Sequence, residues 1–174
     1  MAATGDFGIR DAAAPPLVRE AVLAGLVGAV VVAIWFLALD LFQGRPLFTP
    51  AALGSALFLG ARGMGEVEVS ALTVLGYTIV HTAAFIAVAL LLGVLVRGVA
   101  YHPPALLGAA LLLVTMETFM IGALAILASW LLDALSLWTV LVANVLAVIS
   151  MGLVLWYRNP AIRAGLRADL EEGQ

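Results

Sequence analysis

Four polar residues interrupt long apolar stretches of the sequence, and their side chains could do chemistry inside a membrane. They are Asp40, His81, Glu117 and Asn144. An ionisable group at such depth costs several kcal/mol by most measures, so it needs a partner or a function. We therefore take these four positions as the starting point for a functional site.

His81 and Glu117 are predicted to lie at the same depth. The two apolar runs that contain them are joined by a short connection at residues 97–103, which predicts a helical hairpin. His81 comes before the middle of this connection, and Glu117 comes a similar number of residues after it. At a rise near 1.5 Å per residue, the heights of the two residues along the hairpin differ by no more than about one helical turn. Asn144 lies seven residues into the last apolar run, at a similar height.

These residues and neighbouring threonines form one predicted polar cluster: His81, Glu117, Asn144, Thr78, Thr82 and Thr118. It could be a hydrogen-bonded clasp that fixes helix register, although such bonds contribute only about 0.6 kcal/mol on average in membranes. It could be a proton relay or a site for the polar head of a substrate, because a buried Glu beside a His can stabilise both charges or share one proton. It could also provide His81 as the axial ligand of a haem or chlorophyll-type ring, although no second deep histidine is present.

Asp40 lies in the last turn of the first apolar run, five residues before Arg45. We predict that the two side chains form an ion pair at the outer end of this helix. The alternative is an outer vestibule that leads to the predicted polar cluster.

The sequence excludes several other kinds of chemistry. Cysteine is absent, which removes disulfides, thiolate metal sites, iron–sulfur clusters and a cysteine nucleophile. No nucleophile elbow, zinc-protease motif, P-loop or dinucleotide-binding motif is present. No metal site is predicted, and no cofactor beyond the ring considered for His81. The basic residues are all arginine and are scattered along the chain, so no nucleic-acid partner is expected.

The elements that position the predicted polar cluster must be membrane helices. Hydrophobic residues make up 64% of the 174 residues and charged residues 11%, whereas a soluble domain has roughly 45–50% apolar and about 25% charged residues. One membrane span needs about 20 apolar residues. We therefore predict an all-α, antiparallel four-helix transmembrane bundle whose spans cover residues 17–42, 72–96, 104–132 and 137–157.

The longest connection, residues 43–71, is predicted to contain a short helix in the outer membrane interface. Thr49 is the expected N-cap, Pro50 the first helical residue, and Gly60 or Gly63 the end. This helix is predicted to be a lid that covers the bundle, and the alternative is a gate for substrate.

The distribution of arginine predicts the orientation of the spans. One side of the bundle receives Arg10, Arg19, Arg97, Arg158, Arg163 and Arg167, and the other receives Arg45 and Arg62. Because arginine-rich segments stay in the cytoplasm, both termini are predicted to be cytoplasmic. Residues 1–16 are expected to be a flexible tail, and residues 158–174 a short amphipathic tail on the membrane surface.

Small residues repeat along the first and last predicted spans. They are Ala21, Gly25, Gly28, Ala29, Ala143 and Ala147. Such residues let two helix backbones approach closely in a membrane. We predict that they form helix-packing surfaces, and that small residues facing the lipid dock the protein onto itself or onto a larger complex.

Much of the helical sequence consists of three segments, DLFQGRPLFTPAALGSALF, LGYTIVHTAAF and WTVLVANVLAVISMGLVLW. They resemble small four-span bacterial inner-membrane proteins to which no function is assigned. The resemblance implies a multi-pass protein of the bacterial inner membrane. It implies no activity, cofactor or catalytic residue.

The sequence favours a non-enzymatic membrane protein over an enzyme. We predict an accessory or assembly subunit of a larger membrane complex or of a homo-oligomer, embedded in the lipid bilayer. The alternative is a small proton-coupled transporter or channel that uses His81 and Glu117. A haem- or pigment-binding protein or a membrane enzyme is the third interpretation.

Overall fold

The computed structural model describes residues 17–99, 122, 129–134 and 136–158. These residues are largely helical and contain no strand. The long helices are α1 (Leu17–Phe42), α3 (Ala71–Val99) and α6 (Leu137–Arg158), and the short ones are α2 (Phe48–Gly54), the π-helix η1 (Ser55–Leu59), the 3-10 helix η2 (Met64–Glu66) and α5 (Ser129–Ala134).

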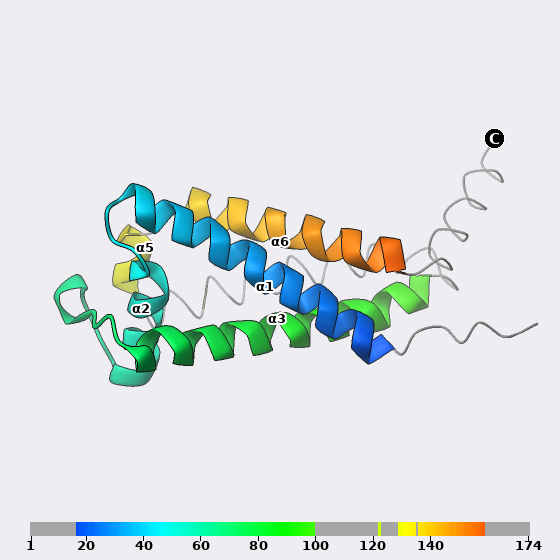
Figure 1. Cartoon of the computed structure of the whole chain (residues 1–174), viewed down its shortest axis with the longest axis horizontal. Helices are drawn as coiled ribbons and strands as arrows, with labels where there is room; N and C mark the ends of the chain where they lie inside the picture. The colour runs from blue at the N-terminus through cyan, green and yellow to red at the C-terminus, as the bar shows by residue number, and fades with distance from the viewer. Residues whose placement is uncertain (1–16, 100–121, 123–128, 135, 159–174) are drawn as a thin grey trace, which may run out of the picture.

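Helix α1 is the centre of the described bundle. It packs against both α3 and α6 and runs antiparallel to each of them (Figure 1). Helices α2 and α5 lie at the end of the bundle where α1 ends and where α3 and α6 begin. Segments that are distant in the sequence therefore meet at this end.

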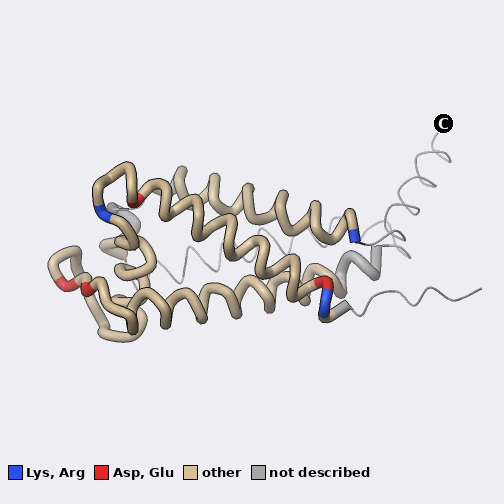
Figure 2. Tube along the Cα trace, in the orientation of Figure 1, with Lys and Arg blue, Asp and Glu red and all other residues tan. Residues whose placement is uncertain are grey.

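Charged residues lie at the two ends of the bundle, and the middle has none among the described residues (Figure 2). In α1, for example, no Asp, Glu, Lys or Arg occurs between Glu20 and Asp40. By length and composition, α1, α3 and α6 are each able to cross a membrane. The described part of the chain is therefore all-helical and has three candidate membrane spans.

The predicted third span falls largely outside the described residues. Of residues 104–132, the structure describes Gly122 and the part of α5 up to Leu132. Glu117, Thr118 and the tail at 1–16 also lie outside the described part. The third predicted span, and with it the four-span bundle, therefore stays a prediction.

Helix α1 ends in a glycine turn. Gly44 has a φ of 68°, a conformation that glycine adopts at little cost. The Gly44 N–H donates to the Leu41 carbonyl at 3.0 Å, and the Arg45 N–H donates to the Asp40 carbonyl at 2.8 Å. This pair of hydrogen bonds is the Schellman motif, which closes a helix and lets the chain turn within a few residues.

Helix α2 begins before the predicted position. The prediction of Thr49 as N-cap is wrong, because Thr49 lies inside α2 and the N-cap is Leu47, which has a φ of 63° and no capping hydrogen bond from its side chain. At the other end, Gly60 closes η1 with a φ of 71°, and it is one of the two glycines proposed for this role. The sequence therefore indicated the helix and one end of it.

The small residues of α1 lie inside the bundle. A Cβ on Gly25 would be 2.6 Å from the Cα of Ile86 in α3, and a Cβ on Gly28 would be 2.7 Å from the Sδ of Met151 in α6. The other members of the predicted packing stripes, Ala21, Ala29, Ala143 and Ala147, are also buried. These residues therefore let α1 contact its two neighbours within the chain, and they do not form an exposed docking surface.

Candidate intramembrane binding site

Asp40 holds α2 against the end of α1. Its side chain is 2% exposed, and its two carboxylate oxygens accept hydrogen bonds from the backbone N–H and from the hydroxyl of Thr49, both at 2.7 Å. The first N–H groups of a helix have no partner within the helix and carry partial positive charge, so a carboxylate is a favourable acceptor there. Asp40 therefore caps the N-terminus of α2, although it lies in another helix.

Arg45 does not pair with the Asp40 side chain. Its guanidinium lies 4.2 Å from the centre of the Phe48 ring and hydrogen-bonds the Gln43 side chain. Arg45 contacts Asp40 only through its backbone N–H. Both carboxylate oxygens of Asp40 already bind Thr49, which corrects the expectation of an Asp40–Arg45 ion pair.

The other end of the α2–η1 helix is held by the start of α3. Gly54 lies so close to the Thr73 carbonyl that a Cβ at this position would clash with it. The Ser55 hydroxyl accepts the Glu68 N–H at 3.0 Å, and the Thr73 hydroxyl donates to the Glu68 carbonyl at 2.6 Å. Helix α2 therefore bridges α1 and α3 at one end of the bundle.

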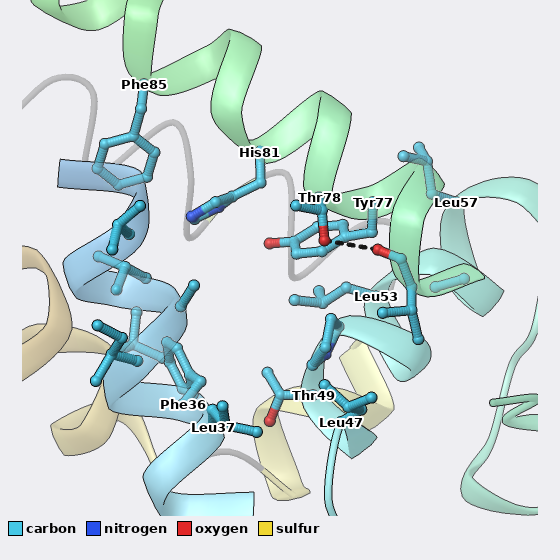
Figure 3. Close-up of a pocket in the computed structure, with 18 of the residues that line it drawn as sticks. Phe36, Leu37, Leu47, Thr49, Leu53, Leu57, Tyr77, Thr78, His81 and Phe85 are labelled. Carbon is cyan, nitrogen blue, oxygen red and sulfur yellow. Dashed lines mark hydrogen bonds between the residues drawn. The ribbon is translucent and has the colours of Figure 1, made fainter. Parts of the chain in front are cut away.

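A cavity of about 420 Å³ lies beneath this bridge, between α1, α2, η1 and α3, with two residues contributed by α6 (Figure 3). Its lining is mostly aliphatic and aromatic. The polar side chains among the described lining residues are Thr49, Tyr77, Thr78, His81 and Asn144, and no Asp, Glu, Lys or Arg is among them. The cavity is therefore apolar and presents a few hydrogen-bonding groups.

Three aromatic side chains of α3 follow one another along the cavity at intervals of four residues. The ring centres of Tyr77 and His81 are 5.7 Å apart, and those of His81 and Phe85 are 4.7 Å apart. The His81 Nε2–H donates to the carbonyl of Ala29 in α1 at 3.3 Å. This bond fixes the orientation of the ring and leaves Nδ1 as a hydrogen-bond acceptor.

The Tyr77 hydroxyl points into the cavity (Figure 3). Within the part of the chain that the structure describes, it makes no hydrogen bond. The neighbouring Thr78 hydroxyl, in contrast, donates to the Val74 carbonyl of its own helix at 2.7 Å. Tyr77 therefore offers a donor to a molecule in the cavity, and the Thr78 proton is already engaged.

The structure brings part of the predicted polar cluster together. His81, Thr78 and Asn144 all line the cavity. Thr82 lies instead beside a shallow surface depression with Ile79 and other α3 residues. Because Glu117 and Thr118 are outside the described residues, their place in the cluster stays a prediction.

A catalytic metal has no evident site in the described part of the chain, where no group of three or more His, Asp or Glu side chains could hold a metal ion. His81 is surrounded by the two aromatic rings of Tyr77 and Phe85 and by the Ala29 carbonyl. Its established interactions are therefore hydrogen bonding and ring packing.

Sequence reasoning missed Tyr77, Phe85 and Thr49 as members of this site. A signal for the first two was present, since Tyr77, His81 and Phe85 are spaced at i, i+4 and i+8, which places them on one helical face. No signal could have identified Thr49 as a partner of Asp40, because that contact depends on how α2 lies against α1.

The chain has no match among known proteins that would name this site: no family model, no curated protein and no solved structure is similar to it. The cavity and the side chains that line it are therefore the features of the molecule that indicate a function.

Proposed function

We propose that this protein binds a lipid-soluble molecule in the cavity between α1, α2 and α3. The single observation that carries the proposal is the cavity itself, with a volume of about 420 Å³, an apolar lining and a few convergent polar groups. Small-molecule sites in proteins have these properties and volumes of roughly 300–1,000 Å³. A binding role needs no catalytic residue, in keeping with the absence of a catalytic motif in the sequence.

The position of the cavity favours a ligand that arrives through the membrane. Several apolar side chains that line it are also exposed on the surface of the bundle, including Ile34, Leu37 and Leu57. In a membrane this surface faces lipid tails, so an apolar molecule would reach the cavity without passing through water.

We further propose that the protein spans the bacterial inner membrane four times, with both termini in the cytoplasm. The three candidate spans, the arginine distribution and the resemblance to four-span inner-membrane proteins support this arrangement. The α2 end of the bundle, and with it the cavity, then lies in the outer half of the membrane. A reporter enzyme fused after Gln174 should be active only in its cytoplasmic form, and periplasmic activity would contradict this orientation.

The binding proposal is tested by filling the cavity. Ala33 lines it from α1, whereas Ala87 is exposed on α3 away from the lining. Native mass spectrometry of the full chain in mild detergent should show a bound apolar molecule in the wild type and in Ala87→Phe, and loss of that molecule in Ala33→Phe. Equal retention in both variants, or no bound molecule in the wild type, would contradict the proposal.

The two roles expected from the sequence remain separate predictions. The first role is an accessory or assembly subunit, which we predicted from small residues along the helices. Because the bundle itself buries those residues, the exposed apolar surface is the remaining support for this role. The proton-coupled transporter requires Glu117 beside His81, and Glu117 lies outside the described residues. Neither role conflicts with a bound lipid-soluble ligand.

A further inference from the structure

We infer that the ligand of this cavity is an uncharged lipid whose flat, carbonyl-bearing ring accepts a hydrogen bond from Tyr77. The inference rests on the proposed binding function and adds the chemical class of the ligand. It is carried by three observations about the lining: its lack of charge, the unused Tyr77 hydroxyl, and its aromatic side chains.

Among the described residues, the lining contains no Asp, Glu, Lys or Arg that could pair with a charged ligand. His81 is the one titratable side chain besides Tyr77 among the described lining residues, and Asp40, which binds the lining residue Thr49, already has both carboxylate oxygens engaged. An ion without a partner in an apolar site carries a large desolvation penalty. A phosphate or carboxylate head group therefore does not fit this cavity, whereas a neutral one does.

The Tyr77 hydroxyl favours a ligand that accepts a hydrogen bond. Tyr77 presents a donor that no described residue uses, whereas the Thr78 hydroxyl and the His81 Nε2–H donate to backbone carbonyls. A carbonyl oxygen on the ligand satisfies the Tyr77 hydroxyl without needing a donor of its own.

The aromatic side chains favour a flat ring over a plain hydrocarbon chain. Tyr77, His81 and Phe85 line one side of the cavity from α3, and Phe36 faces them from α1 (Figure 3). Aromatic rings prefer offset-stacked or edge-to-face contacts with other rings. A planar ring between these helices makes such contacts on both sides.

The experiment measures binding of decyl-benzoquinone, a neutral ring with two carbonyls, to the full chain in detergent. Trp35 packs against the same core residues as Phe36 and Phe85, so quenching of tryptophan fluorescence reports occupancy. Tyr77→Phe keeps the ring and removes only the hydroxyl. It should weaken binding about three- to ten-fold, the usual effect of one hydrogen bond.

Three controls fix the interpretation. Tyr157→Phe, at an exposed position on α6, should leave the affinity unchanged. Decylbenzene and dodecanoate do not quench tryptophan, so their binding is measured by how well they displace decyl-benzoquinone and restore the fluorescence. Decylbenzene, which lacks the carbonyls, should bind more weakly than decyl-benzoquinone, and Tyr77→Phe should not change its affinity. The anion dodecanoate should bind more weakly than the quinone.

The outcomes separate the inference from the function on which it rests. If Ala33→Phe abolishes quinone binding but Tyr77→Phe does not weaken it, the carbonyl assignment is wrong and the cavity remains a binding site. Tighter binding of dodecanoate would overturn the neutral class of ligand. If Ala33→Phe binds the quinone as the wild type does, the cavity is not the binding site and the proposed function fails with it.

Discussion

Helices α1 and α3 meet in two different ways along their length. In the tight half, residues 21–29 of α1 approach α3 so closely that Gly25 has no room for a Cβ beside Ile86. In the open half, residues 30–37 of α1 and 74–85 of α3 border the cavity. The same pair of helices thus combines a backbone contact, which fixes their crossing, with a space that can accept a ligand.

The side chains at the interface explain this difference. Small residues in the tight half allow the backbones to touch, and membrane helices gain their association energy from such close packing. In the open half, Phe36 and Tyr77 are too large for a close approach, and α2 covers the end of the space between the helices. We expect substitutions in the tight half to affect stability most, and those in the open half to affect binding most.

The largest expected effect is at Gly25 in the tight half. Gly25→Leu places a side chain against the α3 backbone, which cannot move aside without separating the helices, so we expect a loss of about 3 kcal/mol or more. The melting temperature in detergent should fall by about 6–12 °C. Gly152→Leu is the control, because nothing lies within 4 Å of a Cβ there. Equal melting of the two variants would break the proposed distinction between the halves.

A smaller effect is expected at Asp40, which holds α2 over the open half. Asp40→Asn keeps the shape of the side chain but replaces one acceptor with a donor that faces the Thr49 N–H or hydroxyl. We expect a loss of about 1–3 kcal/mol, with faster hydrogen exchange of the α2 amides. Glu68→Gln, at an exposed side chain, should change neither quantity. Unchanged exchange in Asp40→Asn would show that α2 is held by its α3 contacts alone.

The predicted pairing of His81 with Glu117 concerns the same open half. If the two side chains pair, His81→Gln and Glu117→Gln should each destabilise the protein, and the double variant should lose about 1 kcal/mol less than the sum. The free energy of unfolding of the four proteins measures this coupling. Tyr157→Phe, at an exposed position on α6, combined with Glu117→Gln serves as the control and should be additive. If the effects of His81→Gln and Glu117→Gln were also additive, the predicted pairing would be wrong. The hydrogen bond from His81 to the Ala29 carbonyl would then explain the position of the His81 ring.

The smallest effect is expected at Arg45. Its guanidinium lies over the Phe48 ring and beside Gln43 rather than on a carboxylate. Arg45→Ala should therefore cost about 0.5–1 kcal/mol, the usual value for an exposed cation–π contact. The free energy of unfolding is measured by urea or thermal denaturation. If Arg45→Ala lost as much of it as Asp40→Asn does, the result would favour the Asp40–Arg45 ion pair that the sequence suggested.

The sequence contained most of the information about the long helices and less about the site. Apolar runs with aromatic or charged residues at their ends indicated helices at 17–42 and 137–157, and α1 and α6 occupy these positions within one residue. The N-cap at Thr49 was predicted from a local rule, but the distant Asp40 carboxylate provides the acceptor instead. Long-range contacts of this kind depend on chain path, which local spacing does not determine.

The site was predictable only in part for the same reason. Counting from the ends of the spans placed His81 and Asn144 at one height, and both line the cavity. The spacing of Tyr77, His81 and Phe85 defines a face of α3, but it does not reveal that α1 stands away from that face. The existence of the cavity follows from where α2 lies, and α2 is placed by side chains far apart in the sequence.

The unequal lengths of the three candidate spans bear on the thickness of membrane that suits this protein. The candidate span in α6 has 21 residues and the one in α3 has 24, which correspond to lengths of about 32 and 36 Å at 1.5 Å per residue. A hydrocarbon layer of about 30 Å matches α6 when it stands upright but is too thin for α3, which must tilt or extend beyond it. Because α3 carries the aromatic side of the cavity, a thicker bilayer would let it stand more upright relative to the shorter span of α6, which contributes Asn144 to the lining. Lipid chain length is thereby coupled to the width of the cavity, so the protein's affinity for its ligand should vary with the membrane that surrounds it.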